Sequence, residues 1–267
     1  MHKYRIVKTS VANIYNSSTF TSQIVTQALL WEELLVCEKK DDWYKVKQND
    51  GYVGWIHSFY TIDSTVYDNN KLLKDKNNWF WIKDRFLVVT LKNNSDLYIS
   101  FGSLIPCIQD EKKFFILLPT NEKINIDTNS LIPYYNRNKI ENILSYAKSL
   151  IGVPYLWGGK SSFGYDCSGL IQILCKMSGY TFLRDCNMQI KSNLLVEINK
   201  EDIKVGDLIY FKDEGKISHV GILLANNKFL HSSGYVKINS INSNDDDFNS
   251  KLCQSIYAFY RLKSIQC

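Results

Sequence analysis

Apolar residues in roughly the first half of the chain come only in short runs, which polar clusters separate. Residues Trp43–Lys47 alternate between apolar and polar side chains, and Tyr52–Ile56 resume the pattern. Between them, Asn49-Asp50-Gly51 has the composition of a hairpin turn. Short strands joined by tight turns build small antiparallel modules. Residues 1–65 are therefore predicted to form a small antiparallel β-barrel.

A second group of short apolar runs follows a polar connector at residues 66–77. Its clearest members are Phe86–Val89, Leu97–Ile99 and Phe114–Leu118, again with polar turns between them. The pattern predicts a second small β-barrel over residues 78–132.

The pattern changes at about residue 136. Apolar residues at 140, 143, 144 and 147 have helical spacing, and a glycine-rich loop leads to a second helix with Leu170, Ile171 and Leu174 on its apolar face. After residue 200 the chain turns to strands, at Leu208–Phe211, Val220–Leu224 and Ile256–Phe259. A helical hairpin against an antiparallel sheet makes residues 136–267 an α+β domain, and the whole chain a multidomain α+β protein.

Composition excludes several classes of protein. The chain has 267 residues, of which 45% are hydrophobic and 22% charged, a globular composition. Its net charge of +5 is spread without a basic block, which argues against nucleic acid as a partner. No apolar run approaches the roughly 20 residues that span a bilayer. No signal peptide is recognisable, and seven scattered cysteines without CxxC favour a reducing cytoplasm. We expect a monomer without a cofactor.

Two of the four histidines, His219 and His231, lie within residues 136–267, each on a predicted strand. Twelve positions separate them, and Ala225-Asn226-Asn227 supplies a turn between their strands. Neighbouring antiparallel strands would place the two imidazoles side by side.

Cys167 lies where the glycine-rich loop becomes the second helix, directly after Asp166, a favourable N-cap. The helix N-terminus and a histidine partner both lower a thiol pKa, so a reactive thiolate is expected here. The alternative is a buried structural cysteine, the interpretation given to Cys37, Cys107, Cys175 and Cys253.

One cysteine and two histidines could also hold zinc with an open position. No HxE or CxxC pattern accompanies them, so this alternative ranks below covalent catalysis and no metal site is predicted.

Several ordered blocks between residues 138 and 262 resemble the signature of NlpC/p60 cysteine peptidases, which are papain-like. The blocks are Tyr155–Gly159, Tyr165–Leu170, Gly206–Phe211, Ser218–Ile222 and His231–Gly234. Residues Asp42–Val46 and Asp50–Trp55 resemble a bacterial SH3 domain. The resemblance implies two SH3-like domains followed by a papain-like catalytic domain.

The same resemblance implies roles for the site. Cys167 becomes the nucleophile and His219 the general base, and His231 orients His219. Tyr155 and the Cys167 backbone N–H become the oxyanion hole, with a ring packed under the loop as the equal alternative for Tyr155. Trp157 shapes the pocket wall or packs beneath it.

The combination of domains is similar to γ-D-glutamyl-L-diamino acid endopeptidases, which recycle murein peptides carrying a free N-terminal L-Ala. That similarity implies a murein-derived peptide as the substrate partner, ending in diaminopimelate or Lys. Leu183 and Cys186 depart from the subgroup, where Pro and a small residue are usual. The implied substrate-binding residues are Tyr52, Asp166, Ser168, Asp185, Cys186, Trp157 and Glu32. For Glu32, a solvated loop carboxylate is the slightly favoured interpretation.

Two other functions stay open. SH3-like modules bind peptides and cell walls, so the chain could be a non-catalytic binding protein. The same fold also supports amidases and acyltransferases.

Overall fold

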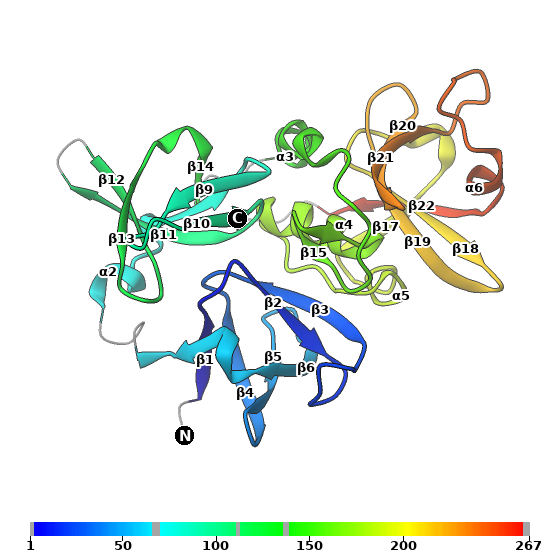
Figure 1. Ribbon diagram of the computed structural model, residues 1–267. Helices are drawn as coiled ribbons and strands as arrows, with labels where there is room; N and C mark the ends of the chain where they lie inside the picture. The colour runs from blue at the N-terminus through cyan, green and yellow to red at the C-terminus, as the bar shows by residue number, and fades with distance from the viewer. Residues whose placement is uncertain (1–2, 66–69, 111–112, 136–138, 264–267) are drawn as a thin grey trace. The chain divides into compact units, whose positions relative to one another are not determined.

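The computed structural model describes residues 3–65, 70–110, 113–135 and 139–263. Its contacts divide the chain into two units, residues 1–137 and 138–267, drawn from blue to green and from green to red in Figure 1. No helix in the described part of the chain is long and apolar enough to cross a bilayer.

The N-terminal unit begins with a seven-stranded antiparallel sheet, ordered β3-β2-β6-β5-β4-β1-β7. The predicted hairpin is confirmed, because Trp43 pairs with His57 and Lys47 with Val53 across it. Gly51 takes a φ of +86°, which glycine adopts without strain. The strands are β1 (Tyr4–Val7), β2 (Val11–Tyr15), β3 (Ile24–Leu29), β4 (Glu33–Lys40), β5 (Trp43–Lys47), β6 (Val53–His57) and β7 (Thr61–Asp63).

The expected closed barrel over residues 1–65 is wrong. Among the described strands, β3 and β7 form the two edges of an open sheet. Register shifts in β2 and β4 mark β-bulges, which bend a strand locally. The bent sheet encloses its own apolar core, centred on Ala12, Leu34 and Val46, without pairing its edges. The bulge in β4 spans Cys37, which is exposed, so its assignment to the core is also wrong.

The next strands form a five-stranded sheet, ordered β13-β12-β11-β8-β14, beside the hairpin of β9 and β10. These strands are likewise not a closed barrel, and a second SH3 domain stays a prediction. The elements are α2 (Lys71–Lys74), β8 (Trp79–Ile82), β9 (Phe86–Thr90), β10 (Asp96–Ser100), β11 (Leu104–Asp110), β12 (Lys113–Leu117), β13 (Lys123–Ile126) and β14 (Leu131–Pro133).

The two β-modules share one core. The Trp31 indole donates a 2.7 Å hydrogen bond to the Leu117 carbonyl, and its ring lies 5.8 Å from that of Trp79, edge to face. Ile6 and Leu30 of the first module pack in the same cluster as Ile105 of the second. Cys107 is buried there as predicted. The middle strands therefore fold as part of the N-terminal unit.

The C-terminal unit is α+β, as predicted. Its six-stranded antiparallel sheet has the order β17-β22-β18-β19-β20-β21, and helix α4 packs against β19 and β20 (Figure 1). The helices are α3 (Ile140–Ala147), α4 (Cys167–Met177), α5 (Cys186–Gln189) and α6 (Ser250–Gln254). The strands are β15 (Lys160–Ser161), β16 (Gly164–Tyr165), β17 (Leu195–Ile198), β18 (Leu208–Asp213), β19 (Lys216–Leu223), β20 (Lys228–Ser233), β21 (Tyr235–Ser240) and β22 (Ile256–Leu262).

Helix α4 is the central element of this unit. Its predicted apolar face, Leu170, Ile171 and Leu174, is fully buried, and Cys175 is buried as well. Asp166 is confirmed as its N-cap, because the carboxylate accepts the Gly169 N–H. A helix buried on nearly every side has a fixed position, so the residue at its first turn is fixed too.

Candidate active site

Cys167 occupies the first position of α4 and is 7% exposed. The backbone N–H groups of Ser168 and Val220 face its sulfur and favour the thiolate. Burial outweighs them and raises the pKa of Cys167 to about 12, with further increases from the charge of Asp166 and from Cys186. The expected lowered thiol pKa is therefore wrong for the free protein, because loss of hydration disfavours the charged form.

The glycines of the preceding loop allow close approach of three backbone segments. A Cβ atom at Gly159 would lie 2.4 Å from the Gly164 carbonyl oxygen, and one at Gly169 would lie 2.2 Å from the Gly159 oxygen. The Gly158 N–H donates to Asp166 Oδ2 at 2.9 Å. The loop thus lies directly on the start of α4, at a distance that only glycine permits.

A buried ion pair fixes the start of α4. Arg184 is 1% exposed, and its guanidinium binds both carboxylate oxygens of Asp166, at 2.9 and 2.6 Å. The same guanidinium donates to Ser168 Oγ at 2.9 Å. Together with the amides of Gly158 and Gly169 and the Ser168 hydroxyl, five donors surround the Asp166 carboxylate. Asp166 therefore acts in the fold as both a helix cap and a clamp.

Helix α5 is held against the start of α4. The buried Gln189 side chain donates to the Ser168 carbonyl at 3.1 Å and to the Leu183 carbonyl at 2.9 Å. Asp185 and Cys186 lie between Leu183 and Gln189 in the chain, and both are half-buried. The Cys186 thiol contacts the Ile217 carbonyl of β19 at 3.5 Å, and burial raises its pKa.

The two histidines lie side by side, as the strand pattern predicts. β19 and β20 pair directly, and His219 Nε2 lies 2.8 Å from His231 Nδ1. Burial lowers the pKa of His219 to about 3, helped by His231 and by the charge of Lys237. Burial also lowers the pKa of His231 to about 4, against the opposing hydrogen bond of Asn239. Both imidazoles are therefore neutral at pH 7.

Tyr155 and Trp157 differ in exposure. Tyr155 is half-buried, and its backbone N–H donates to the Gly234 carbonyl at 2.9 Å. Burial, followed by the nearby Cys167, raises the pKa of the Tyr155 phenol well above its usual value. The phenol is therefore a hydrogen-bond donor at neutral pH. Trp157 is 62% exposed, so its ring is not packed beneath the loop, and its role in the pocket wall stays a prediction.

Tyr52 and Glu32 belong to the N-terminal unit. Glu32 accepts the Leu29 N–H at 2.8 Å and a hydrogen bond from Gln48 at 3.4 Å, so its carboxylate shapes the turn after β3. Tyr52 is half-buried after the β5–β6 turn. Their roles in substrate binding stay predictions.

Sequence reasoning assigned no role to Arg184, Gln189 and Asn239. The available signal was the segment around Leu183 and Cys186, which was compared with the endopeptidase subgroup and which contains Arg184 and Gln189. Asn239 Oδ1 lies 2.8 Å from His231 Nε2, and Asn239 carried no sequence signal of its own. In the described ranges, no group of three His, Cys, Asp or Glu residues has the geometry of a metal site.

Two family models match the chain. The NlpC/P60 family model matches residues 152–256, and the bacterial dipeptidyl-peptidase SH3 domain matches residues 14–58. A protein of Bacillus subtilis (strain 168) named gamma-D-glutamyl-L-lysine dipeptidyl-peptidase is 30% identical over 221 residues, covering 78% of this chain and 72% of that protein. The chain belongs to the NlpC/P60 family.

The NlpC/P60 match includes Cys167, His219, His231 and every residue found around them. A protein of the same name from Bacillus cereus is 29% identical over 235 residues, covering 80% of this chain and 68% of that protein. The crystal structure of an NlpC/P60 family protein from Bacillus cereus superposes with a TM-score of 0.83, covering 97% of this chain and 99% of that one. At 21% identity, that likeness establishes the shared fold.

Proposed function

We propose that this chain is a cysteine peptidase that hydrolyses the γ-D-glutamyl–diamino acid bond of murein peptides with a free N-terminal L-Ala. The observation that carries the proposal is the position of Cys167, at the start of a buried helix, facing the strand that holds His219. The names of the two Bacillus relatives support the choice of the γ-D-glutamyl–diamino acid bond as the one that is cleaved. Recycling of murein peptides belongs to the same proposal and rests on the resemblance to the endopeptidase subgroup, and the cytoplasmic location rests on the scattered cysteines.

The proposed chemistry begins from a neutral thiol and a neutral imidazole. His219 takes the proton of Cys167 as the sulfur attacks the glutamyl carbonyl carbon, and a carbon–sulfur bond forms. The Cys167 N–H and the Tyr155 hydroxyl donate to the developing oxyanion. The His219 imidazolium then gives its proton to the departing amine of the diamino acid, and the carbon–nitrogen bond breaks. Water, deprotonated by His219, hydrolyses the thioester and restores the thiol.

Asp166 and Asp185 are the two candidate carboxylates for binding the substrate ammonium. Five donors already surround Asp166, so we assign the substrate ammonium first to Asp185, which is half-buried. A charge-assisted hydrogen bond of this kind contributes about 1.5–3 kcal/mol. Ser168 and Cys186 lie beside these carboxylates as candidates for the peptide backbone, and Trp157 for the wall. Tyr52 and Glu32 stay candidates from the SH3 domain.

The test is mass spectrometry of L-Ala-γ-D-Glu-L-Lys and its diaminopimelate counterpart after incubation with the protein. We expect L-Ala-γ-D-Glu and the free diamino acid, at a rate that falls at least about 10⁴-fold in Cys167→Ala. The exposed Cys37→Ala is the matched control and should keep the wild-type rate. N-acetylation of the peptide should slow cleavage more than about tenfold.

Each failure has a distinct meaning. Wild-type turnover by Cys167→Ala would remove the nucleophile from the proposal. Binding of the peptide without cleavage would favour the non-catalytic alternative. Equal rates on free and acetylated peptides would leave the peptidase and overturn the recognition of the free amine.

A further inference from the structure

A chain of hydrogen bonds leads from His219 to the backbone of the loop after β21. His219 Nε2 lies 2.8 Å from His231 Nδ1, and His231 Nε2 lies 2.8 Å from Asn239 Oδ1. The Asn239 amide nitrogen then donates to the Asp247 carbonyl at 2.6 Å. His231 is 1% exposed and Asn239 is half-buried, so water competes little at the inner end of the chain.

The far end of this chain determines the direction of every bond in it. The Asp247 carbonyl oxygen only accepts, so the NH₂ group of Asn239 must face it, and Asn239 Oδ1 must face His231. Because Oδ1 also only accepts, His231 Nε2 carries a hydrogen. A neutral His231 then has a bare Nδ1, which accepts a hydrogen from His219 Nε2. His219 Nδ1 is thereby left unprotonated.

We propose that Asn239 is a positioning residue that sets both histidines in the Nε2–H tautomer and leaves His219 Nδ1 as the base for the Cys167 proton. This inference rests on the proposed function for its kinetic consequence only. The opposite tautomer of His219 would present an N–H to the thiol and take no proton from it. Asn239 touches neither the thiol nor the reacting carbonyl in the proposed mechanism, so it acts through His231.

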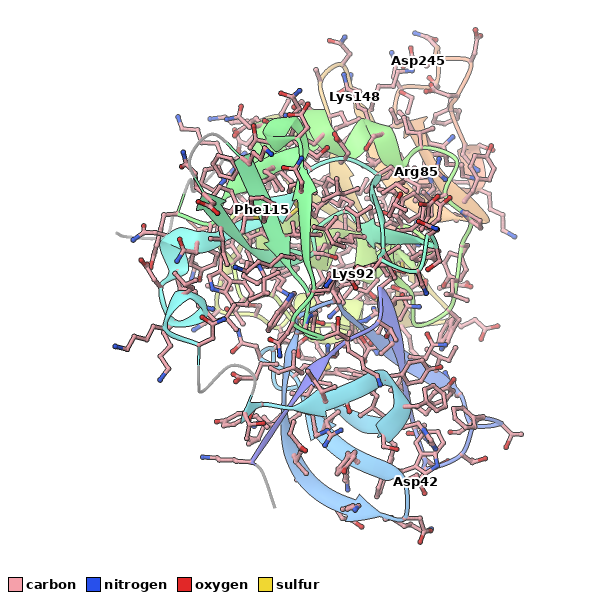
Figure 2. All side chains as sticks on the ribbon, turned by 60° about the vertical axis from the view of Figure 1, so that its left-hand side comes forward. Asp42, Arg85, Lys92, Phe115, Lys148 and Asp245 are labelled. Carbon is pink, nitrogen blue, oxygen red and sulfur yellow. The ribbon has the colours of Figure 1, made fainter. Side chains whose placement is uncertain are left out.

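The loop that supplies the carbonyl is anchored on both sides. The Ser240 N–H donates to the same Asp247 carbonyl at 3.2 Å. The Lys228 ammonium of β20 pairs with the Asp245 carboxylate at 3.0 Å and with that of Asp247. Asp245 also accepts from Ser240 Oγ at 2.7 Å. Figure 2 shows Asp245 on the outer part of this loop, and these contacts hold the inner part against β20 and β21.

The charged groups around this chain of hydrogen bonds come from several elements. Lys237 of β21 acts on both histidines and lowers the pKa of each, and Lys228, Asp245 and Asp247 form the ion-pair cluster behind Asn239. The thiol of Cys167 on α4 is neutral in the resting site because burial raises its pKa to about 12. A charge introduced at residue 239 would therefore act on His231 first.

The experiment combines kinetics with two-bond ¹H–¹⁵N spectra of the histidine rings in the full chain. Asn239→Leu keeps the size and removes both hydrogen bonds. We expect kcat to fall roughly 10- to 100-fold, as for loss of the outer hydrogen-bond partner of a working histidine, with KM unchanged. The spectra should show Nε2–H for His219 and His231 in the wild type and loss of that single tautomer in the variant.

Two further variants complete the design. Asn239→Asp keeps an acceptor for His231 Nε2–H, so the tautomer and most of kcat should return, while the acid limb of the pH profile moves to higher pH because the carboxylate favours His231⁺. Asn199→Leu makes the same substitution at an exposed position and should keep the wild-type kcat.

The outcomes separate this inference from the proposed function. Wild-type kcat and an unchanged Nε2–H tautomer in Asn239→Leu would overturn the role of Asn239. Should that variant fail to fold, an Nδ1–H signal for His231 in Asn239→Asp would overturn it as well. Loss of the tautomer together with no cleavage of the peptide by the wild type would uphold the positioning role and remove the proposed function.

Discussion

The two sides of the candidate site hold their groups by opposite means. On the thiol side, a buried pair of formal charges, Asp166 and Arg184, fixes the start of α4. On the histidine side, neutral hydrogen bonds run from His219 through His231 to Asn239. An arginine does not change its protonation state in proteins, whereas an imidazole that serves as a base must do so in every turnover.

The ion pair and the neutral hydrogen bonds each suit the group that they hold. A permanent charge pair gives fixed geometry, which a nucleophile at a helix start requires. A fixed negative charge next to the histidines would favour the imidazolium and weaken the base in the resting site. A neutral amide sets the orientation of the rings without that cost. The comparison therefore predicts large stability effects on the thiol side and effects on protonation on the histidine side.

The largest effect is expected from Arg184→Met. It leaves the Asp166 carboxylate buried without its partner, and breaking a buried pair in this way costs about 3–5 kcal/mol. Urea unfolding monitored by circular dichroism measures the loss. Lys45→Met is the matched control, because Lys45 pairs with Glu38 and both side chains are exposed, by 41% and 54%.

The double variant Arg184→Met with Asp166→Asn sharpens this test. It removes both charges and keeps a side-chain oxygen as the cap of α4, so part of the lost stability should return. A loss in Arg184→Met no greater than in Lys45→Met would show that the charge pair does not hold the thiol side.

The sequence was sufficient for the parts of the site that depend on local signals. Asp166 precedes the helix that it caps, and the turn at Ala225-Asn226-Asn227 brings His219 and His231 onto paired strands. These features follow from neighbours in the chain and from the alternation of strands. The order of helices and strands in the C-terminal unit followed for the same reason.

Long-range packing decided what the sequence did not reveal. Arg184 meets Asp166 across 18 positions, and its burial is a property of the folded unit. The raised pKa of Cys167 has the same origin, because burial outweighs the Ser168 amide at the helix start and the Val220 amide of β19. The register shifts in β2 and β4 likewise depend on how the strands pair in the folded unit, and short apolar runs do not encode them.

The second prediction concerns acid stability on the histidine side. Burial lowers the pKa of His219 to about 3 and of His231 to about 4, from 6.5. Below pH 6.5 the unfolded chain binds protons that the folded chain does not. The contribution of the two histidines to stability is therefore complete above pH 6.5 and is lost as the pH falls towards about 4 for His231 and about 3 for His219. The urea midpoint at pH 5 should lie below that at pH 7.

His231→Asn tests the origin of that slope. Asparagine does not titrate, so the difference between the two midpoints should shrink in the variant, whatever its absolute stability. An unchanged slope would mean that His231 does not contribute its protonation to acid unfolding, and the histidine side would then resemble the thiol side in being insensitive to pH in this window.

The smallest effect is expected from Cys186→Ser, which tests whether the thiol side depends on its second sulfur. The Cys186 thiol contacts the Ile217 carbonyl at 3.5 Å, and a serine hydroxyl can donate to the same oxygen. Ser is also close in size, so α5 should stay in place and kcat should remain within about threefold, less than 1 kcal/mol in barrier. Cys175→Ser provides the contrast, because a hydroxyl in a fully buried position without a partner costs about 1–3 kcal/mol of stability. Steady-state cleavage of L-Ala-γ-D-Glu-L-Lys measures kcat of Cys186→Ser, and urea unfolding measures the stability of both variants. A tenfold loss of kcat in Cys186→Ser would place this sulfur among the groups that set the geometry of Cys167, and the ion pair of Asp166 and Arg184 would no longer account for the thiol side by itself.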